Sequence, residues 1–485
     1  MKKTATLLTV SALILALSAC GNSAPAATTT AASEQPAVTT AKDADKETTT
    51  AEQTTAPEET TTAETTAKPV ENKAGFKQTA TIEETVLVDQ DGIKVTAKEL
   101  TYSMYAASLE LSLENSSNND VTIMSGTLGY SCNSVNGIMT DDGYFNCEVK
   151  AGKKAKESVK FSYDDLMLYG IDEIADIELG IYSSTGSFDY TYYPVSQIKT
   201  SAAGSYNYDS KKCYNALTSS EMQSEHNYRI IYSAEDALYN IDDVSIVSEV
   251  MLENNSGESM LMIEAQNNSA YQSRLIVNDI YINGIKVNSA NWTSKLVNPG
   301  KSAMIDVNLS AVFLDSYWDL YGITEIRNVK LGIAQTDRDN TSTSKPAAIE
   351  IPVAGGENSA DTSGTVAYDE GGVQVIYKGV AGAKYDYDKS MYVMLLVENK
   401  SGHTVIIDEE YGSFSLNGFM TDSYIYSTTV GNDECAAWKI ELPERALEDS
   451  GVKQTSDINE IEFGIEIRDE SWSNKKEGTV VIKPE

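Results

Sequence analysis

Alternation of apolar and polar residues with a period of two dominates the chain beyond residue 80. Leu109, Leu111 and Leu113 alternate with polar residues, and this period indicates a strand with one face buried. The same signal returns at Leu261, Ile263 and Ala265, and again at Val393, Leu395 and Val397. We therefore predict three copies of one strand, each ending at an Asn that is followed two residues later by Ser: Asn115, Asn267 and Asn399.

Turn signals surround this strand in the same order in every copy. A tight turn precedes the strand, at Asp91-Gly92, Asp242-Asp243 and Gly371-Gly372. Asp and Gly accept the positive φ that such turns require. An Asn-Gly pair between apolar neighbours follows the strand, at 136–137, 283–284 and 417–418. Asn-Gly is the strongest short hairpin signal, so each copy is predicted to contain two hairpins.

The second half of each copy adds an alternating strand, a short helix and a strand interrupted by Gly. The inward residues of the alternating strand are expected to be Val159 and Phe161, then Ile305, Val307 and Leu309, then Trp438, Ile440 and Leu442. We expect Ser162 and Ser310 to cap the helix in the first two copies and Pro443 to be its first residue in the third. The expected helix stops are Gly170, Gly322 and Gly451. The interrupting residues are Gly180, Gly332 and Gly464, which predict a bulge or a close backbone approach.

These elements predict a mainly β protein with three tandem antiparallel β-sandwich domains, each with a short helical crossover. The Asn-Gly turns lie too far apart for a solenoid unit, so each copy is a whole domain. We assign repeat 1 to residues 76–204, repeat 2 to 205–354 with an extra N-terminal segment, and repeat 3 to 355–485. The pattern resembles the immunoglobulin-like modules that recur in surface lipoproteins of Gram-positive bacteria, without the Cys-Trp-Cys pattern of antibody domains. That resemblance implies an extracellular protein.

The N-terminus carries the features of an export signal. Lys2 and Lys3 precede an apolar run at 7–17 that is too short to span a membrane. The run ends in Leu17-Ser18-Ala19-Cys20, which resembles the lipobox of bacterial lipoproteins. The resemblance implies a signal peptide at 1–19, cleavage after Ala19 and a lipid on Cys20, which would anchor the chain to the extracellular face of the cell membrane. An ordinary secretory signal with a chance Cys is the alternative.

A polar linker follows the expected anchor. Residues 21–75 contain no aromatic residue and are rich in Thr, Ala and Glu. Such a segment buries too little apolar surface to offset the chain entropy lost on folding. We therefore expect residues 20–75 to be a lipidated Cys and a disordered linker. Fully extended, the linker reaches about 180–200 Å.

The acidic balance of the chain limits its partners. The 485 residues carry a formal net charge of -35. A surface this acidic repels phosphate backbones, which argues against nucleic-acid binding. The charge is equally consistent with solubility and self-repulsion.

Candidate chemistry is sparse. Of the five Cys, Cys132 and Cys147 flank a hairpin and either form a disulfide or stay reduced, whereas Cys213 and Cys435 are expected to be unpaired thiols. The two His, His226 and His403, are too few for a zinc site, and no catalytic motif contains them. Asp89-Gln90-Asp91-Gly92 resembles a calcium loop but lacks the later acidic ligands. We therefore expect no metal, no cofactor and no catalytic residues.

Tyrosine is the one unusual residue, with 28 Tyr against 8 Phe. Phe188, Tyr190 and Tyr192 alternate along one expected strand, with Tyr193 on its other face. Tyr suits contacts with sugars or proteins, and it also suits half-exposed strands for structural reasons alone. We predict a non-enzymatic surface binding or adhesion protein whose partner is a cell-wall glycan or a surface protein. The alternatives are a structural or envelope-assembly lipoprotein and, third, a glycan-active hydrolase using Asp and Glu.

Overall fold

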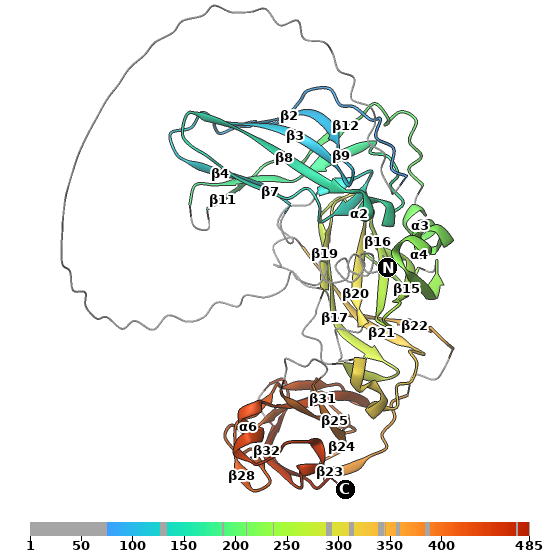
Figure 1. The fold of residues 1–485 in the computed structure, drawn as a ribbon, viewed down its shortest axis with the longest axis vertical. Coiled ribbons are helices and arrows are strands. Elements are labelled where there is room, and N and C mark those ends of the chain that lie inside the picture. The colour runs from blue at the N-terminus through green and yellow to red at the C-terminus, as the bar shows by residue number, and fades with distance from the viewer. Residues whose placement is uncertain are drawn as a thin grey trace, which may run out of the picture.

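A computed structural model describes residues 75–484, with gaps at 127–132, 187–188, 210, 236, 288–292, 310–314, 338–343, 345, 356–358, 384–388 and 472–473. The fold is mainly β, with antiparallel sheets that pack face to face (Figure 1). The prediction of a mainly β protein of the β-sandwich class is therefore confirmed. Among the described helices, none has the length and apolar character needed to cross a membrane. The predicted signal peptide, Cys20 and the linker up to residue 74 lie outside the described residues.

Repeat 1 packs a four-stranded sheet against two further groups of four strands. The first sheet has the order β1 (Thr85–Gln90), β2 (Ile93–Tyr102), β3 (Ala106–Asn115), β8 (Lys153–Ser162). A second sheet has the order β11 (Tyr190–Tyr192), β10 (Ile181–Ser184), β4 (Val121–Ser125), β7 (Phe145–Val149). The remaining strands of the repeat are β12 (Ser196–Lys199), β9 (Asp176–Leu179), β5 (Asn133–Val135) and β6 (Ile138–Thr140). These last four belong to a sheet that continues into repeat 2.

Repeat 2 follows the same order, but one strand, β17, stands for β4 and β5, and one strand, β21, stands for β9 and β10. Its first layer comprises β13 (Tyr228–Ala234), β14 (Tyr239–Ile241), β15 (Val244–Asn254), β16 (Ser259–Asn267) and β20 (Lys301–Asn308). Its second layer comprises β17 (Ser273–Ile282), β18 (Ile285–Val287), β19 (Thr293–Val297), β21 (Val329–Thr336) and β22 (Ala347–Ile351). The extra N-terminal segment forms two helices, α3 (Lys212–Thr218) and α4 (Ser220–His226), as well as β13.

Repeat 3 repeats this plan. Its first layer comprises β23 (Thr365–Glu370), β24 (Val373–Gly382), β25 (Met391–Asn399), β29 (Tyr424–Ile425) and β31 (Glu434–Leu442). The opposing sheet comprises β26 (Val405–Glu409), β27 (Ser415–Leu416), β28 (Phe419–Met420), β30 (Thr428–Val430), β32 (Ile461–Arg468) and β33 (Lys475–Ile482). β18 of repeat 2 pairs with β31, so a sheet again continues across the boundary.

The short helices agree with the predicted stops but not with every predicted start. Helix α2 (Tyr163–Leu168) has Ser162 as its N-cap, whose side chain accepts a hydrogen bond from the Asp165 amide. In repeat 2 the helix is a 3-10 helix, η1 (Asp315–Tyr321), and Ser310 lies outside the described residues. In repeat 3, Pro443 is the N-cap of α6 (Glu444–Asp449) and not its first residue, because its ψ of 157° is extended. The three predicted stops, Gly170, Gly322 and Gly451, all have φ near +70°. A short 3-10 helix, η2 (Thr455–Asp457), follows in repeat 3.

The alternating strands form the predicted cores. Leu109, Leu111 and Leu113 and their counterparts in the other repeats are at most 2% exposed. The inward residues predicted for β8, β20 and β31 are equally buried. The tight turns also form as expected, since Asp91, Asp242 and Gly371 all have positive φ.

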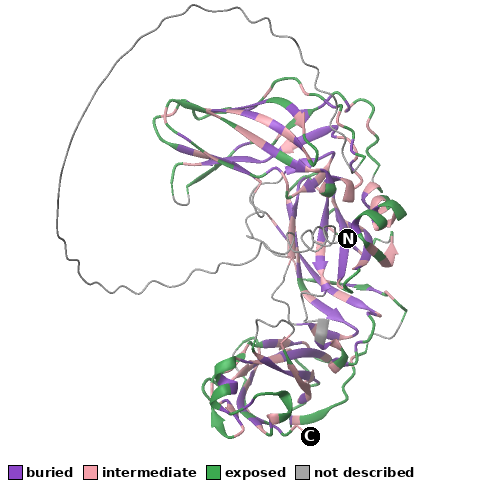
Figure 2. Ribbon diagram, viewed as in Figure 1, coloured by how far each residue is buried: buried purple, intermediate pink, exposed green. Residues whose placement is uncertain are grey.

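The prediction that only one face of the alternating strand is buried holds for repeat 1 alone. The outer face of β3 carries Ser108, Glu110 and Ser112, none of which is buried. The corresponding residues of β16 and β25 are largely apolar and buried, for example Met260, Met262, Met394 and Leu396. Helix α3 and side chains of repeat 1 cover the first of these faces, and repeat 2 covers the second. Figure 2 shows the strands of the middle of the molecule mostly buried.

Candidate functional site

Two parallel strand pairs connect the repeats. In the first, β6 of repeat 1 lies beside β20 of repeat 2, with Ile138 opposite Ser302. The Ser302 amide donates a 3.0 Å hydrogen bond to the Gly137 carbonyl. In the second, β18 of repeat 2 lies beside β31 of repeat 3, with Ile285 opposite Cys435. The Asn-Gly hairpin of one repeat therefore adds a strand to the edge of the next, and we call these two contacts junction 1 and junction 2.

A side chain at each Asn-Gly turn fixes the hairpin in place. Asn136 has φ of 50°, as the mirror-image hairpin turn requires. Its amide nitrogen donates to the Glu173 carbonyl at 2.7 Å, and its side-chain oxygen accepts hydrogen bonds from the amides of Ala175 and Asp176. Asn283 and Asn417 make the equivalent three bonds in their repeats. The hairpins are therefore presented by a rigid support.

Junction 1 combines a small apolar contact with two ion pairs. Met139 is 7% exposed and packs against Leu296, Val297 and Ala303. The Lys301 ammonium lies 2.7 Å from the Glu178 carboxylate, and both side chains are largely buried. Lys295 makes a further ion pair with Asp141. An ion pair as buried as that of Lys301 and Glu178 fixes the register between surfaces more than it adds stability.

Junction 2 places opposite charges at the same two positions. Glu434 begins β31 as Lys301 begins β20, and each pairs with the Asn that ends the neighbouring strand. The Glu434 carboxylate accepts a 2.9 Å bond from Lys330 and a 2.6 Å bond from the Tyr281 hydroxyl. Burial acts to raise the pKa of Glu434, but these two bonds and the lysine charges outweigh it, so the pKa is lowered overall.

Junction 2 is also the more apolar of the two. The core of repeat 2 continues through Ile285 and Val287 into Met394 and Leu396 of repeat 3. Tyr321, at the end of η1, is 1% exposed and donates a 2.9 Å hydrogen bond to the Leu395 carbonyl. Burial of this kind is the main source of stability at an interface.

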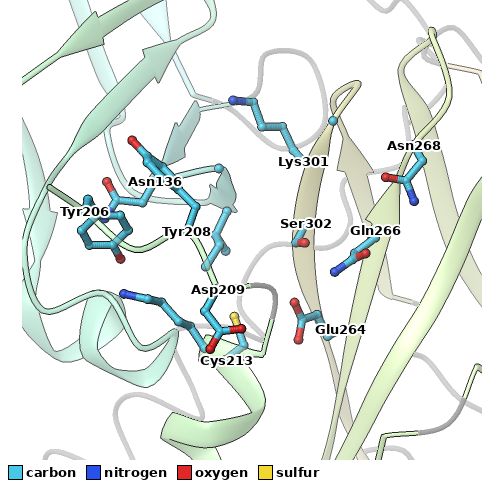
Figure 3. Close-up of a pocket in the computed structure, with 14 residues that line it drawn as sticks. Asn136, Tyr206, Tyr208, Asp209, Cys213, Glu264, Gln266, Asn268, Lys301 and Ser302 are labelled. Carbon is cyan, nitrogen blue, oxygen red and sulfur yellow. The ribbon is translucent and has the colours of Figure 1, made fainter. Parts of the chain in front are cut away.

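A polar cavity of about 230 Å³ lies at junction 1, between residues 206–213 and strands β16 and β20 (Figure 3). Glu264 faces it and is 3% exposed, and burial raises its pKa to about 7 although the hydroxyls of Ser248 and Ser302 bond to it. Cys213, 1% exposed, lies beside it, and burial raises the pKa of this thiol. The cavity is smaller than the ~300–1,000 Å³ typical of ligand sites.

Within the described part of the chain, no other repeat packs on the third Asn-Gly hairpin. Phe419 is 56% exposed and Met420 is 65% exposed on β28. Residues 417–422 read Asn-Gly-Phe-Met-Thr-Asp, and residues 136–141 of the docked hairpin read Asn-Gly-Ile-Met-Thr-Asp. Sequence reasoning found both turns but not this shared motif, which a direct comparison of the copies would have revealed.

The structure does not bring the other sequence candidates together. His226 is buried at the end of α4, whereas His403 lies in an exposed turn of repeat 3 beside Ser401. Among the described residues, no group of three or more His, Cys, Asp or Glu could hold a metal ion. Two runs of acidic residues, Asp141-Asp142 and Asp408-Glu409-Glu410, are held by contacts within the protein. Asp142 accepts a 2.7 Å bond from the Ser162 amide, and burial raises its pKa to about 7. Asp408 is paired with Arg468.

The cysteine predictions are only partly tested. Among the described residues, Cys213 and Cys435 are free and buried. Cys132 lies outside the described residues, and Cys147 is a free thiol.

The Asn-x-Ser segments act as strand-ending turns, as predicted. The Asn115 side chain donates to the carbonyls of Asn119 and Val149 and accepts from the Ser117 amide. Asn267 and Asn399 make the same contacts.

The predicted tyrosine row lies on β11 of repeat 1. Tyr190 and Tyr192 are 47% and 38% exposed, and both rings contact Tyr182. Tyr193 points to the other face, where it is buried and its hydroxyl bonds to Ser183, while Phe188 lies outside the described residues.

Comparisons with known proteins add little. No protein-family model and no curated protein sequence matches the chain. Among solved structures, a transglutaminase of red sea bream is similar at 9% identity and a TM-score of 0.15, over 63% of this chain and 38% of that one. An exo-chitosanase of Amycolatopsis orientalis is 10% identical with a TM-score of 0.14, over 50% of this chain and 26% of that one. A protein of unknown function from Porphyromonas gingivalis W83 is 7% identical with a TM-score of 0.14, over 47% and 91%. At these scores the likenesses carry no conclusion about function.

Proposed function

We propose that this chain is a lipid-anchored extracellular protein that binds a protein partner through its last repeat and has no catalytic activity. The observation that carries the proposal is the third Asn-Gly hairpin. It exposes Phe419 and Met420, whereas Met139 at the matching position of repeat 1 is 7% exposed. Surface apolar side chains that gather on one rigid element are typical of interaction sites.

The rest of the molecule supports this role by holding the hairpin at a distance. Repeat 1 follows the expected linker, and repeat 3 lies at the other end of the described array (Figure 1). Shared sheets and buried ion pairs at both junctions resist bending between repeats. Tyr424 and Tyr426, in the segment that follows β28, are also 54% and 70% exposed.

The binding surface can be tested with the full mature chain, residues 20–485, immobilised and exposed to a surface-protein extract and to purified cell wall. Replacing Phe419 and Met420 together by Ser should abolish retention of a defined surface protein. The control is Val366→Ser, because Val366 is 51% exposed on β23 of the same repeat. The proposal would be contradicted if the parent, the Phe419 and Met420 double variant and the Val366→Ser control all retained the surface protein equally.

The anchor is tested separately by Cys20→Ala. This change removes the acceptor of the lipid, so the protein should leave the membrane fraction or accumulate as uncleaved precursor. Two or more acyl chains hold a protein stably at ~0.8 kcal/mol per buried CH₂, so the expected shift is nearly complete. Normal processing and fractionation of the variant would remove the lipoprotein part of the proposal.

A second candidate function is glycan binding by repeat 1, favoured by the exposed Tyr190 and Tyr192 beside Tyr182. Aromatic rings stack on sugar faces. Tyr190→Ala with Tyr192→Ala should then reduce retention on purified cell wall and leave the protein capture described above unchanged.

A further inference from the structure

We propose that the partner of the exposed hairpin is a second copy of this chain, so that β28 of one molecule docks on the edge strand β8 of the next. The inference rests on the proposed function and names the partner of the same surface. It extends to two molecules a contact that the chain already makes twice within itself, at junctions 1 and 2.

At each junction, the repeat that supplies the hairpin is called the donor and the repeat that supplies the edge strand is called the acceptor. The hairpin end of repeat 3, a free donor end, carries the groups that repeat 1 uses at junction 1. There, Met139 packs against repeat 2, and Asp141 and Glu178 pair with its lysines. The equivalents in repeat 3 are Met420, Asp422 and Glu462, by the shared hairpin motif and by the matching strand register. All three are exposed.

The acceptor edge of repeat 1 offers the matching positions. Lys153 begins β8 and lies opposite Asn115, as Lys301 lies opposite Asn267 in repeat 2. Val149 and Ala155 stand where Val297 and Ala303 receive Met139. β8 is the last strand of its sheet, and no strand in the described part of the chain pairs with its outer edge. Lys153 and Glu462 also have no ion-pair partner within the described residues.

The charges of the two free ends are complementary. Exposed Lys153, Lys154, Lys156 and Lys160 line β8. At the other end, exposed Asp422 follows β28, and exposed Glu462 lies on β32 opposite Ser415 of β27, the strand that pairs with β28. Lysines on an edge strand discourage pairing with arbitrary strands, because their charges lose water or repel other cations. An acidic hairpin pairs with these charges and is therefore accepted at this edge.

The contact between molecules is expected to be weaker than either junction. At junctions 1 and 2 the donor helix contributes Leu168 and Leu320 to the contact, but repeat 3 has Asp449 at this place. The outer face of β3 is likewise polar, where β16 and β25 are apolar. A contact made mainly by a strand pair, one methionine and opposite charges is reversible and sensitive to salt.

The geometry predicts a specific register. By analogy with Ser302 and Gly137, the Lys154 amide donates to the Gly418 carbonyl of the neighbouring molecule, and Glu462 pairs with Lys153. Because donor and acceptor lie at opposite ends of the molecule (Figure 1), the contact is head-to-tail and produces open chains of molecules.

The test is sedimentation velocity of the full mature chain, residues 20–485, carrying Cys20→Ala so that no lipid is attached. We expect the average mass to rise with protein concentration at low salt and to fall again at ~0.5 M salt, where charges are screened beyond roughly 4 Å. Glu462→Lys and Lys153→Glu should each weaken self-association about tenfold or more. Circular dichroism checks that both variants stay folded.

Mixing the two variants gives the decisive result. Each variant alone sets like charges against one another, but the altered donor of one matches the altered acceptor of the other, so the mixture should associate again. Glu370→Lys and Lys199→Glu are the controls, because both side chains are exposed on strands away from this contact, β23 and β12, and they should leave association unchanged.

Two outcomes would overturn the inference. One is a monomer at every concentration and salt; the other is loss of association in both variants without recovery in the mixture. If the chain is monomeric but Phe419 and Met420 still govern capture of a different surface protein, the self-association is wrong and the proposed function stands. If the hairpin variant changes neither measurement, both are wrong.

Discussion

Junctions 1 and 2 use one backbone arrangement with opposite charges. Junction 1 sets Glu178 of the donor against Lys301 of the acceptor, and junction 2 sets Lys330 against Glu434. The fold thus determines where the ion pair lies, but it does not determine which partner is positive and which is negative. The signs exclude wrong contacts: Lys330 would meet Lys301 if repeat 2 docked on another repeat 2, and Glu178 would meet Glu434 if repeat 1 docked on repeat 3. Specificity of this kind arises from repulsion in the wrong complexes.

The two junctions also differ in what surrounds the ion pair. Junction 2 is sealed by apolar side chains that belong to one continuous core. Junction 1 contains a polar cavity and buried carboxyl groups with raised pKa values. Junction 2 should therefore depend mainly on packing and junction 1 mainly on protonation.

The largest expected effect comes from removing the aromatic side chain that seals junction 2. Tyr321→Ala creates a cavity and deletes the hydrogen bond to Leu395, so the free energy of unfolding of repeats 2 and 3 should fall by about 4 kcal/mol. Urea unfolding of the full mature chain measures the change. Tyr321→Phe keeps the ring and should cost only about 1 kcal/mol. Tyr169→Ala, at the matching place in repeat 1, should cost less, since Tyr169 is only partly buried; an equal loss would contradict the contrast.

Charge reversal at junction 1 comes next. Lys301→Glu sets two carboxylates together in a largely buried place, and breaking such a pair costs about 3 kcal/mol. The combination with Glu178→Lys should recover most of the loss. Urea unfolding of the parent, the two single variants and the double variant gives the coupling energy. Strictly additive losses would show that the pair does not define the junction.

The pH dependence should separate the two junctions. Burial raises the pKa of Asp142 and Glu264 to about 7 and that of Asp306 to about 6. Because these values lie above those of the unfolded chain, the groups stabilise the fold when protonated, and this stability is lost as pH rises from about 4 to about 7. The change for Glu264 is on the order of 3 kcal/mol at 1.36 kcal/mol per pKa unit. Glu434, whose pKa is lowered, stabilises junction 2 above the unfolded value of 4.5 and loses this effect only at lower pH.

Hydrogen exchange of β20 and β31, corrected for the intrinsic effect of pH, measures this contrast. Protection of β20 should fall between about pH 5 and about pH 7, while protection of β31 stays constant. Glu264→Gln with Asp142→Asn should flatten the β20 profile. A parallel decline in both strands would show that the titrating groups act on the whole molecule instead.

Much of each repeat could be predicted from sequence, because local signals determine it. The Asn-Gly turns need positive φ, and alternating residues such as Leu109 and Leu111 fill the cores. The junctions were not predicted, because they depend on which edges meet in space. The apolar outer face of β25, with Met394 and Leu396, was the available signal, since a strand that is apolar on both sides must be covered twice. The role of Lys301 and Glu434 follows only from the strand register.

The smallest expected effect compares the free hairpin with a docked one. Asn417→Gly keeps the positive φ but removes three side-chain hydrogen bonds, so repeat 3 should lose about 1 kcal/mol. Asn136→Gly removes the same bonds from a hairpin that also carries junction 1, so its loss should be larger and should extend to repeat 2. Urea unfolding gives both values, and hydrogen exchange of β20 locates the effect. If both variants lose the same amount and β20 stays protected in Asn136→Gly, the hairpin would be stable within its own repeat and would not couple one repeat to the next.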